Sequence, residues 1–511
     1  MDYYDRRMMT RRLHFSSLTD DLPGLIERHG DTCVSGIASD SREVSPGDLF
    51  LAYRGFEADG HDFIEHALVN GAVAVVYDNP GHATTVEGVP WARVQDARRA
   101  TAELAADFYG NPSDELLVAG VTGTNGKTTT TFLIAAALSA AGLQGAVMGT
   151  LGYGPVDSRV DAPRTTPDAV ELQRFMRAMV DEGIQAVALE VSSHSLVLHR
   201  PWRCSFDVGV FTNLSQDHLD FHSDIERYFQ AKLMLFREYA EGSSKPMVGA
   251  INLDDEFGRE LAAQASCPVL GYGLRGDCDV RAVDPEMDEA GSSFDLVLPS
   301  GSVHIDLKLP GTFNIFNALG AAAAAHVMGV EAEAIAEGLS SPKSVPGRFE
   351  RVDTGDLPVE VVVDYAHTPE ALANVLSVAR QLNPRRLICV FGCGGDRDPD
   401  KRPKMGRIAT ENADFTVITS DNPRSEDPST IIEAITAGVV GDDYAVEADR
   451  RAAIALALQM AGNGDLVLIA GKGHETYQIF ADRTIDFDDR QVARELAAEI
   501  SGGIASDDVQ R

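Results

Sequence analysis

The segment AGVTGTNGKTTT, Ala119 to Thr130, combines three glycines with a lysine and a run of threonines, which are the residue types that bind nucleotide phosphates. A glycine-rich loop at the start of a helix points backbone N–H groups at phosphate oxygens. Lys127 is then placed to reach the β- and γ-phosphates, and the Thr128 hydroxyl to bind Mg²⁺. The strict pattern has glycine where Val121 stands, but an apolar strand precedes the loop and a helical pattern follows it. We therefore predict an ATP-binding phosphate loop.

Two further apolar runs end in side chains that suit a metal ion. The strand-like run 186–190 ends in Glu190, and the run 208–212 is followed by Asp217 and His218. A carboxylate at a strand tip beside a phosphate loop is where a Mg²⁺ ligand belongs. A histidine after a strand is more often structural when it stands alone. Together with the phosphate loop, however, these residues predict a metal cluster.

Lys232 lies in a mostly apolar helical stretch, YFQAKLMLF. A lysine in a helix is by default a solvated charge. The alternative is a lysine that burial keeps neutral, so that its amine adds CO₂ and becomes a carbamate. The carbamate would be an oxygen ligand suited to Mg²⁺. The residues alone leave both interpretations open.

These side chains need a sheet to position them. From about Arg98 onward, apolar strands alternate with helical patterns, which predicts a parallel sheet with helices on both faces. A strand-rich segment between about 245 and 310 predicts a small antiparallel patch, and SSPKSVPGRFE near residue 343 predicts a linker. The length of 511 residues favours about three domains. We expect them at residues 1–97, 98–343 and 344–511.

The last third of the sequence repeats one pattern, an apolar strand that runs into a polar loop with glycine or proline. In open α/β sheets, ligands bind at the carboxyl ends of the strands, so these loops should converge on one crevice. The predicted strands are Val359–Val363, Leu387–Phe391, Phe415–Thr419 and Leu466–Ala470.

The amino-acid composition restricts the kinds of molecule and compartment that suit this protein. With 44 Lys and Arg against 78 Asp and Glu, the net charge is −34, and such a surface repels nucleic acid. The sequence has no run of 18 apolar residues and no secretory signal pattern, so we expect a soluble cytoplasmic protein without membrane insertion. Six dispersed cysteines indicate reduced thiols, and Cys389 and Cys393 are expected to pack beside a strand.

Seven motifs, in order along nearly the whole chain, resemble those of the Mur ligases. They are GTNGKTT at 123–129, LEVSSH at 189–194, TNLSQDHLD at 212–220, YFQAK at 228–232, GTFNIFN at 311–317, PGRFE at 346–350 and DYAHTP at 364–369. DSR at 40–42 and PGDLF at 46–50 are similar to the N-terminal domain of the members that add the third residue of a peptide. The resemblance implies an N-terminal α/β domain that binds a UDP-linked substrate, a central P-loop ATPase domain with a parallel sheet, and a C-terminal Rossmann-like α/β domain.

The resemblance also implies an activity. It is an ATP-dependent carbon–nitrogen ligase that adds meso-2,6-diaminopimelate to the D-glutamate of UDP-N-acetylmuramoyl-L-alanyl-D-glutamate in peptidoglycan precursor synthesis. The reaction passes through an acyl phosphate. The implied partners are these small molecules with ATP and Mg²⁺, and we expect the protein to act as a monomer.

Site residues follow from the same resemblance. The implied ATP-binding residues are Gly123, Thr124, Asn125, Gly126, Lys127, Thr128, Thr129, Asn314, Arg348 and Asp364. The implied Mg²⁺ ligands are Thr128, Glu190, His218 and carbamylated Lys232, and the last three form the catalytic set with Lys127. The implied contacts to the UDP-muramoyl-dipeptide are Ser41, Phe56, Glu57, Ala58, Thr165, Thr166, Ser192 and Arg200. Relatives often carry Asn and Gln where Arg164 and Leu198 stand, so two substrate contacts differ.

The loop SDNPRSEDP at 420–428 bears on which amino acid is added. Members that add diaminopimelate resemble one another in Asp-Asn-Pro-Arg here, whereas lysine-adding members lack the arginine. Diaminopimelate has a second carboxylate, which an arginine fork binds with two parallel hydrogen bonds. The residues implied for this amino acid are Arg397, Asp421, Asn422, Pro423, Arg424, Gly471 and Glu475.

Three alternatives remain at this point. One is the L-lysine-adding ligase, and a second is another ATP-dependent ligase of the superfamily, such as folylpolyglutamate synthetase. The third belongs to a different class: a P-loop regulatory switch that hydrolyses nucleotide and binds partners without joining substrates. A switch gives no reason for the DNPR loop or for basic residues at strand ends.

Overall fold

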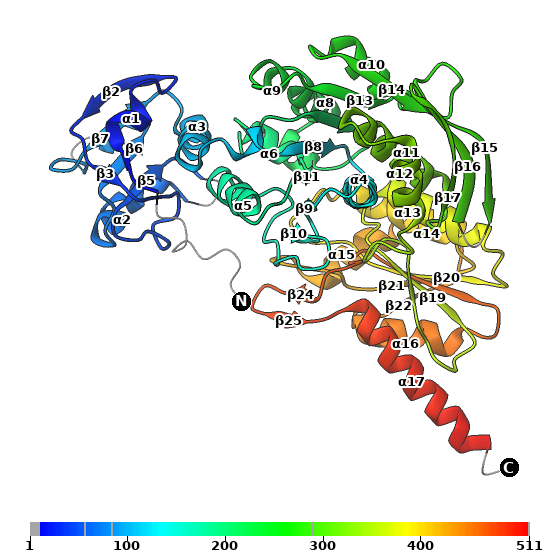
Figure 1. Ribbon diagram of the computed structural model, residues 1–511. Coiled ribbons are helices and arrows are strands. Elements are labelled where there is room, and N and C mark those ends of the chain that lie inside the picture. Colours follow the sequence, from blue (N-terminus) through cyan, green and yellow to red (C-terminus); the bar gives the residue numbers. More distant parts are fainter. Residues whose placement is uncertain (1–10, 56–57, 83–84, 289–290, 509–511) are drawn as a thin grey trace.

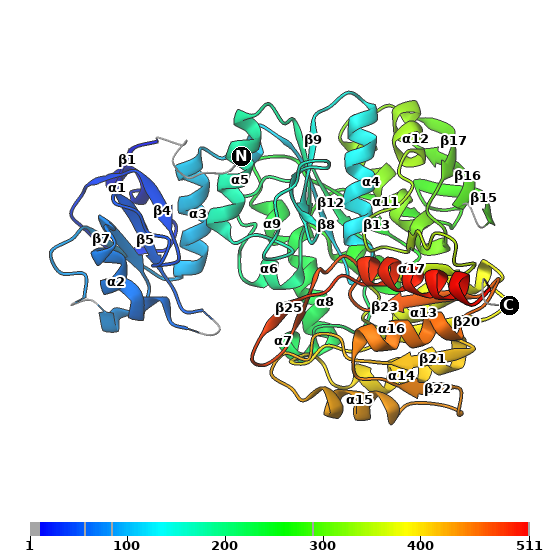
Figure 2. The same cartoon turned by 90° about the horizontal axis from the view of Figure 1, so that it is seen from below.

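The computed structural model describes residues 11–55, 58–82, 85–288 and 291–508, with side chains described as far as residue 501. Three open sheets, each with its own helices, account for most of this part of the chain. Figures 1 and 2 both show the N-terminal sheet at one end of the molecule, with α3 and α5 packed against each other between it and the rest.

The N-terminal sheet has five strands in the order β2-β7-β6-β5-β4, parallel except for β2. The strands are β2 Leu25–His29, β4 Gly36–Ala38, β5 Asp48–Ala52, β6 Ala74–Tyr77 and β7 Trp91–Val94, and the helices are α1 Phe15–Thr19, α2 Ile64–Val69 and α3 Ala97–Tyr109. Asp96 caps α3 by accepting a hydrogen bond from the Arg99 N–H, and left-handed Gly110 ends it. The apolar side of α3 joins the core of this sheet.

The central sheet has ten strands in the order β10-β9-β11-β8-β12-β13-β14-β15-β16-β17, with β9 to β15 parallel and both edges antiparallel. The strands are β8 Leu117–Thr122, β9 Gly145–Gly149, β10 Gly152–Pro155, β11 Ala186–Glu190, β12 Val208–Phe211, β13 Val248–Asn252, β14 Val269–Gly273, β15 Val280–Asp288, β16 Gly291–Leu298 and β17 Gly301–Leu307. The antiparallel strands expected between 245 and 310 therefore begin only at β15, and they extend the main sheet.

Helices cover both faces of the central sheet. Successive residues of β8 point to opposite faces and are buried on both, so each face needs a cover. Ala119 and Val121 point to a core shared with α4 Lys127–Ala140, α11 Thr312–Val327 and α12 Ala332–Ser340. Val118 points to the opposite core, which contains α5 Ala169–Asp181 and α8 Ile225–Leu233. The alanine-rich part of α11 is fully buried, because small side chains let this helix approach the sheet closely.

The C-terminal sheet has six strands in the order β18-β19-β23-β20-β21-β22, all parallel except the edge strand β18. The strands are β18 Glu350–Val352, β19 Glu360–Asp364, β20 Leu387–Phe391, β21 Phe415–Ile418, β22 Tyr444–Val446 and β23 Leu466–Ala470. The helices α13 Pro369–Gln381, α14 Lys401–Asn412 and α15 Pro428–Thr436 cover one face, and α16 Arg450–Met460 and α17 Asp489–Asp508 the other. A hairpin, β24 Tyr477–Ile479 and β25 Thr484–Asp486, precedes α17.

Candidate active site

The loop between β8 and α4 has the shape that binding of phosphate requires. Gly123 and Gly126 have φ of 147° and 87°, which favour glycine, and Gly126 is the cap residue from which α4 starts. A Cβ at Gly123 would lie 1.8 Å from Thr212 Oγ1, and one at Gly126 would lie 2.2 Å from Asn317 Oδ1. Backbone N–H groups at the start of a helix with no side-chain cap are available to an anion.

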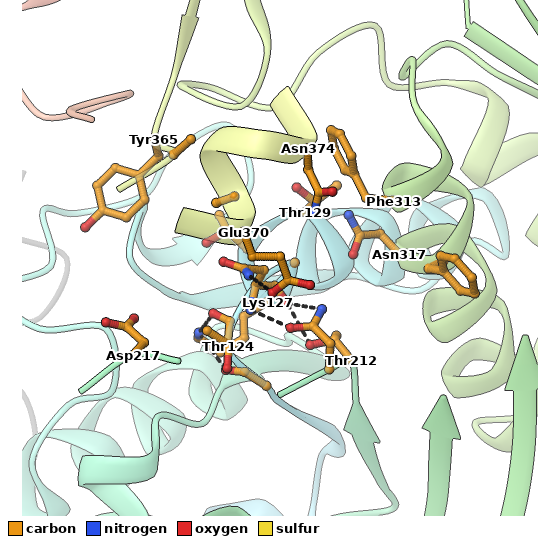
Figure 3. A pocket seen from close by; sticks show the side chains of 18 of the residues that line it. Thr124, Lys127, Thr129, Thr212, Asp217, Phe313, Asn317, Tyr365, Glu370 and Asn374 are labelled. Carbon is orange, nitrogen blue, oxygen red and sulfur yellow. Dashed lines mark hydrogen bonds between the residues drawn. The ribbon is translucent and has the colours of Figure 1, made fainter. Parts of the chain in front are cut away.

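A cavity of about 520 Å³ opens over this loop, between the central and C-terminal sheets. Figure 3 shows Lys127 of α4, Asn317 and Phe313 of α11, and Glu370 and Asn374 of α13 converging on it. Two hydrogen bonds connect the phosphate loop to the C-terminal part of the chain. Asn125 Nδ2 donates to Glu370 Oε2 at 3.2 Å, and Arg348 Nη2 donates to Thr128 Oγ1 at 2.9 Å. The phosphate loop is therefore covered by residues from the last third of the sequence.

Two lysines meet at the phosphate loop. Lys127 Nζ donates to the carbonyl oxygens of Gly123 and Thr124, both at 2.9 Å, and Lys232 Nζ donates to the Gly123 carbonyl at 2.8 Å. Lys232 is 1% exposed and lies over the Tyr228 ring. Burial, reinforced by the charge of Lys127, lowers the pKa of Lys232 well below its usual value. Of the two interpretations of Lys232, the structure thus excludes the solvated charge.

Glu190 is buried at the end of β11 and is held in a fixed orientation. Its carboxylate accepts hydrogen bonds from the Thr150 backbone at 2.9 Å and from the Thr150 hydroxyl at 3.1 Å. Thr165 accepts a hydrogen bond from the same Thr150 hydroxyl at 3.2 Å, and the Thr166 hydroxyl donates to the Glu190 backbone carbonyl at 2.8 Å. The predicted Mg²⁺ ligand Glu190 is therefore directly connected to the predicted substrate contacts Thr165 and Thr166.

Asp217 and His218 follow β12 at the same sheet edge. His218 adopts a left-handed backbone conformation, with φ of 55°, and its N–H donates to Asp217 Oδ1 at 2.9 Å. Burial lowers the pKa of His218 to about 3, although the Asp217 carboxylate opposes the shift. The imidazole is thus neutral and has a lone pair available for a metal.

The residues predicted to hold Mg²⁺ all line the cavity: Thr128, Glu190, His218 and Lys232. Within the described ranges, no three His, Cys, Asp or Glu side chains are grouped so that they alone hold a metal ion. A Mg²⁺ site at this edge therefore needs ligands beyond the Glu190 carboxylate and the His218 imidazole nitrogen, and Mg²⁺ prefers oxygen. The Thr128 hydroxyl is one such donor, and a carbamate on Lys232 would be another. With them the donor set is rich in oxygen, as Mg²⁺ requires.

The predicted nucleotide residues outside the loop are placed differently from one another. Arg348 and Asp364 line the cavity, whereas Asn314 is not among the described lining residues. Asn314 instead donates to the Pro310 carbonyl at 2.8 Å and accepts a hydrogen bond from Asn317, which does line the cavity. The Asp364 carboxylate accepts hydrogen bonds from the backbone N–H groups of residues 349 and 366, both at 2.7 Å.

The predicted UDP-substrate residues divide into two groups. Thr166, Ser192 and Arg200 are connected: the Ser192 N–H donates to Thr166 Oγ1 at 3.1 Å, and Arg200 donates to the Thr166 carbonyl at 3.2 Å. Ser41 lies apart, in the turn after β4 of the N-terminal sheet, where its hydroxyl shares a hydrogen bond of 3.0 Å with His66. Ala58 belongs to the same domain and is exposed, and residues 56 and 57 lie outside the described ranges.

The loops after β20, β21 and β23 assemble the predicted amino-acid site. Arg424, with a left-handed φ of 53°, donates to the Gly395 carbonyl at 2.7 Å, and Arg397 is exposed on the neighbouring loop. Asn422 donates to Glu475 at 2.7 Å, and burial raises the pKa of that carboxyl. Gly471, with φ of 115°, lies so close to Asp421 that a Cβ would approach its carboxylate to 2.5 Å. Pro423 is buried in the same loop.

Several residues of the site were not predicted from the sequence. Asn317, Glu370 and Asn374 line the cavity, and buried Lys472 donates to Asn422 and Glu475 at 3.2 and 3.1 Å. Lys472 had a usable signal, because it lies in the AGKGHETY loop that follows an apolar strand. None of the helices in the described part of the chain has a stretch long and apolar enough to cross a membrane.

Comparison with known proteins agrees with this geometry. Residues 121–325 match the Mur ligase middle domain, residues 347–473 the glutamate ligase domain of Mur ligases, and residues 34–109 the catalytic domain of the Mur ligase family. A solved structure of a UDP-N-acetylmuramoyl-L-alanyl-D-glutamate–2,6-diaminopimelate ligase aligns with a TM-score of 0.67 and 34% identity, and the alignment covers 96% of this chain and all of that one. A MurF structure from Acinetobacter baumannii has the same TM-score at 19% identity, which shows a shared fold.

Two curated relatives bear the name UDP-N-acetylmuramoyl-L-alanyl-D-glutamate–2,6-diaminopimelate ligase. The protein from Geobacter metallireducens is 46% identical over 487 residues, which is 92% of this chain and 95% of its own length. The protein from Syntrophomonas wolfei is 48% identical over 473 residues, which is 91% of this chain and 95% of its own length. With these relatives and all three domain types matched, the chain belongs to the Mur ligase family.

Proposed function

We propose that this protein is an ATP- and Mg²⁺-dependent ligase that joins meso-2,6-diaminopimelate to the D-glutamate of UDP-N-acetylmuramoyl-L-alanyl-D-glutamate, a step of peptidoglycan precursor synthesis. The observation that carries the proposal is the identity of 46–48%, over more than nine tenths of the chain, to relatives that bear this name. The site supports it, because the phosphate loop and the predicted Mg²⁺ ligands line one cavity between two sheets, and the loop that contains Arg424 lies at the carboxyl end of the C-terminal sheet.

The first step is activation of a carboxylate. The D-glutamate γ-carboxylate attacks the γ-phosphorus of ATP, the bond to the β-γ bridging oxygen breaks, and ADP leaves with that electron pair. Lys127 and the N–H groups at the start of α4 stabilise the charge on the phosphates. Arg348 and Asp364 extend the nucleotide site from the linker side, and Asn314 contributes from α11 through its hydrogen bond with Asn317, which lines the cavity.

The second step forms the amide. The amine of diaminopimelate attacks the acyl phosphate carbon, phosphate leaves, and the nitrogen releases a proton. Arg424 and Arg397 bind the distal carboxylate, and the Gly471 carbonyl with Asp421 and Glu475 binds the distal ammonium. Positioning supplies most of the acceleration, because three substrates must meet where water is scarce.

Thr128, Glu190, His218 and Lys232, carbamylated on Nζ, are the proposed Mg²⁺ ligands. Mg²⁺ bound there would neutralise charge on the transferred phosphoryl group. The contribution of the chain is to hold Glu190 through Thr150 and to keep the Lys232 amine unprotonated by burial. An unprotonated amine is the form that reacts with CO₂.

The remaining substrate contacts and the domains are part of the same proposal. Thr165, Thr166, Ser192 and Arg200 hold the muramoyl-peptide arm, and Ser41 with residues 56–58 holds the uridine end. Residues 1–97, 98–343 and 344–511 act as the three domains. We propose that the third domain closes on the second through the linker near residue 343, so that Arg348 reaches Thr128 in the closed form.

The test is product analysis by mass spectrometry. Purified protein receives UDP-muramoyl-dipeptide, ATP, Mg²⁺ and an equimolar mixture of diaminopimelate and lysine. The expected product contains diaminopimelate, with one ADP released for each amide formed. A lysine-containing product would identify the lysine-adding ligase, and ADP release without any amino acid would identify a regulatory nucleotide switch. Either result would contradict the proposal.

A further inference from the structure

Arg450 and Asp489 form a completely buried ion pair behind the amino-acid site. Both side chains are 0% exposed, and two parallel hydrogen bonds join them, Nε to Oδ1 at 2.8 Å and Nη2 to Oδ2 at 2.7 Å. A buried ion pair is often no more stabilising than a well-packed apolar pair of similar volume. The pair therefore calls for a reason other than stability.

The other donors of Arg450 point to that reason. Nη2 also donates to the Ala470 carbonyl at 3.0 Å, and Nη1 donates to the Ser420 carbonyl at 3.4 Å. Ser420 immediately precedes Asp421, and Ala470 immediately precedes Gly471. One guanidinium thus binds the backbone at the start of both loops that contain the proposed ligands of the distal ammonium and carboxylate. We call these two positions, Ser420 and Ala470, the roots of the loops.

The sheet itself does not connect these two roots. Strand β20 lies between β21 and β23, so no ladder of hydrogen bonds runs directly from one root to the other. Neighbouring strands are about 4.8 Å apart, so the roots are two strand spacings apart in the sheet. Arg450 spans that interval at the carboxyl end of the strands, and its rigid fork fixes the separation in a way that a flexible lysine does not.

The positive charge of Arg450 also interacts with carboxylates of both loops. Its pKa is raised because, although burial opposes the charge, the carboxylate of Asp489 and then those of Asp421 and Glu475 favour it.

We propose that Arg450, oriented by Asp489, is a positioning residue that sets the spacing of the two amino-acid-binding loops and so determines affinity for the amino-acid substrate. The inference rests on the proposed function. It differs from a purely structural role because it predicts a selective effect: the KM for the amino acid changes while the KM for ATP does not.

The test compares three variants of the full-length protein. Arg450→Lys keeps the charge but loses the fork, and Arg450→Met with Asp489→Leu removes both charges without leaving either one buried alone. Arg451→Met is the matched control, because Arg451 is the next residue of α16 but its side chain is 40% exposed and pairs with Glu495 and Glu499. Circular dichroism and thermal unfolding identify the variants that remain folded.

In Arg450→Lys we expect the KM for diaminopimelate to rise about tenfold, as loss of one hydrogen bond from a charged group implies, with the KM for ATP within about twofold of wild type. The double variant should show a larger rise, and Arg451→Met none. An unchanged KM for diaminopimelate in a folded Arg450 variant, or an equal rise for ATP, would overturn the inference. Wild type is assayed first: if it joins no amino acid, the proposed function fails and this inference fails with it.

Discussion

Lys127 and Lys232 donate hydrogen bonds to the same acceptor, the carbonyl oxygen of Gly123, at 2.9 and 2.8 Å. Two cations that share one acceptor repel each other, and the repulsion is stronger in a protein interior than in water. Burial lowers the pKa of both lysines, most strongly that of Lys232. Because the shift is stronger for Lys232, we expect Lys232 to be the member of the pair that loses its proton.

The first prediction concerns the amine of Lys232. With ¹³C-labelled bicarbonate, we expect wild-type protein to show a carbamate resonance that is absent in Lys232→Met and retained in Lys127→Met. The same Lys232→Met variant should lose product formation by at least about 100-fold, because the Mg²⁺ site loses a ligand. A carbamate resonance that disappears with Lys127 instead would reverse the roles of the two lysines.

The second prediction concerns Arg424. Arg424→Ala should raise the KM for diaminopimelate by about 100-fold, because a two-point contact to a carboxylate is lost, while ATP binding measured by calorimetry is unchanged. Arg424→Lys should recover only part of the affinity, since an ammonium lacks the fork. Arg407→Ala, which removes an exposed arginine of α14, is the control. Equal loss of ATP binding would show that the loop has a different role.

Much of the fold could be predicted from the sequence because its strands are buried on both faces. Three of the strands have the predicted bounds, Ala186–Glu190, Leu387–Phe391 and Leu466–Ala470. In such strands every residue is apolar up to the point where the polar loop begins, so the sequence marks both ends. The phosphate loop was predictable for a related reason, since its glycines are required by backbone geometry.

The parts that were not predictable depend on contacts between distant segments. Asn317 lines the cavity together with Glu370 and Asn374, which belong to a helix of another sheet. Arg450 and Arg451 are adjacent and identical in type, but the side chain of the first is fully buried and that of the second is partly exposed. Arg450 is buried because it pairs with Asp489, which is 39 residues away. No local sequence pattern predicts that pairing.

The third prediction concerns the contact between Arg348 and Thr128. Arg348→Met removes the hydrogen bond to Thr128 and the contact of the guanidinium with the Tyr365 ring, 4.5 Å from its centroid. We expect the KM for ATP to rise about tenfold, the factor that corresponds to about 1.4 kcal/mol. Steady-state kinetics with ATP varied provide the measurement. Arg351→Met, at an exposed position of β18, should leave the KM for ATP unchanged, and equal effects of the two substitutions would contradict the assignment.

The fourth prediction concerns pH and the stability of the C-terminal sheet. Burial alone would raise the pKa of Asp465, but hydrogen bonds from Arg385 and Arg386 outweigh it and hold that pKa well below its usual range. A depressed carboxyl pKa stabilises the fold at pH values above the unfolded pKa, about 4, and this stability is lost as the pH falls through the folded pKa. Asp465→Asn should therefore lower the free energy of unfolding in urea by about 1–3 kcal/mol at pH 7 and by progressively less below pH ~4.

The control is Asp482→Asn, which removes a highly exposed partner of Arg483 and should change the free energy of unfolding little at any pH. If the effect of Asp465→Asn does not vary with pH, its ionic origin is contradicted.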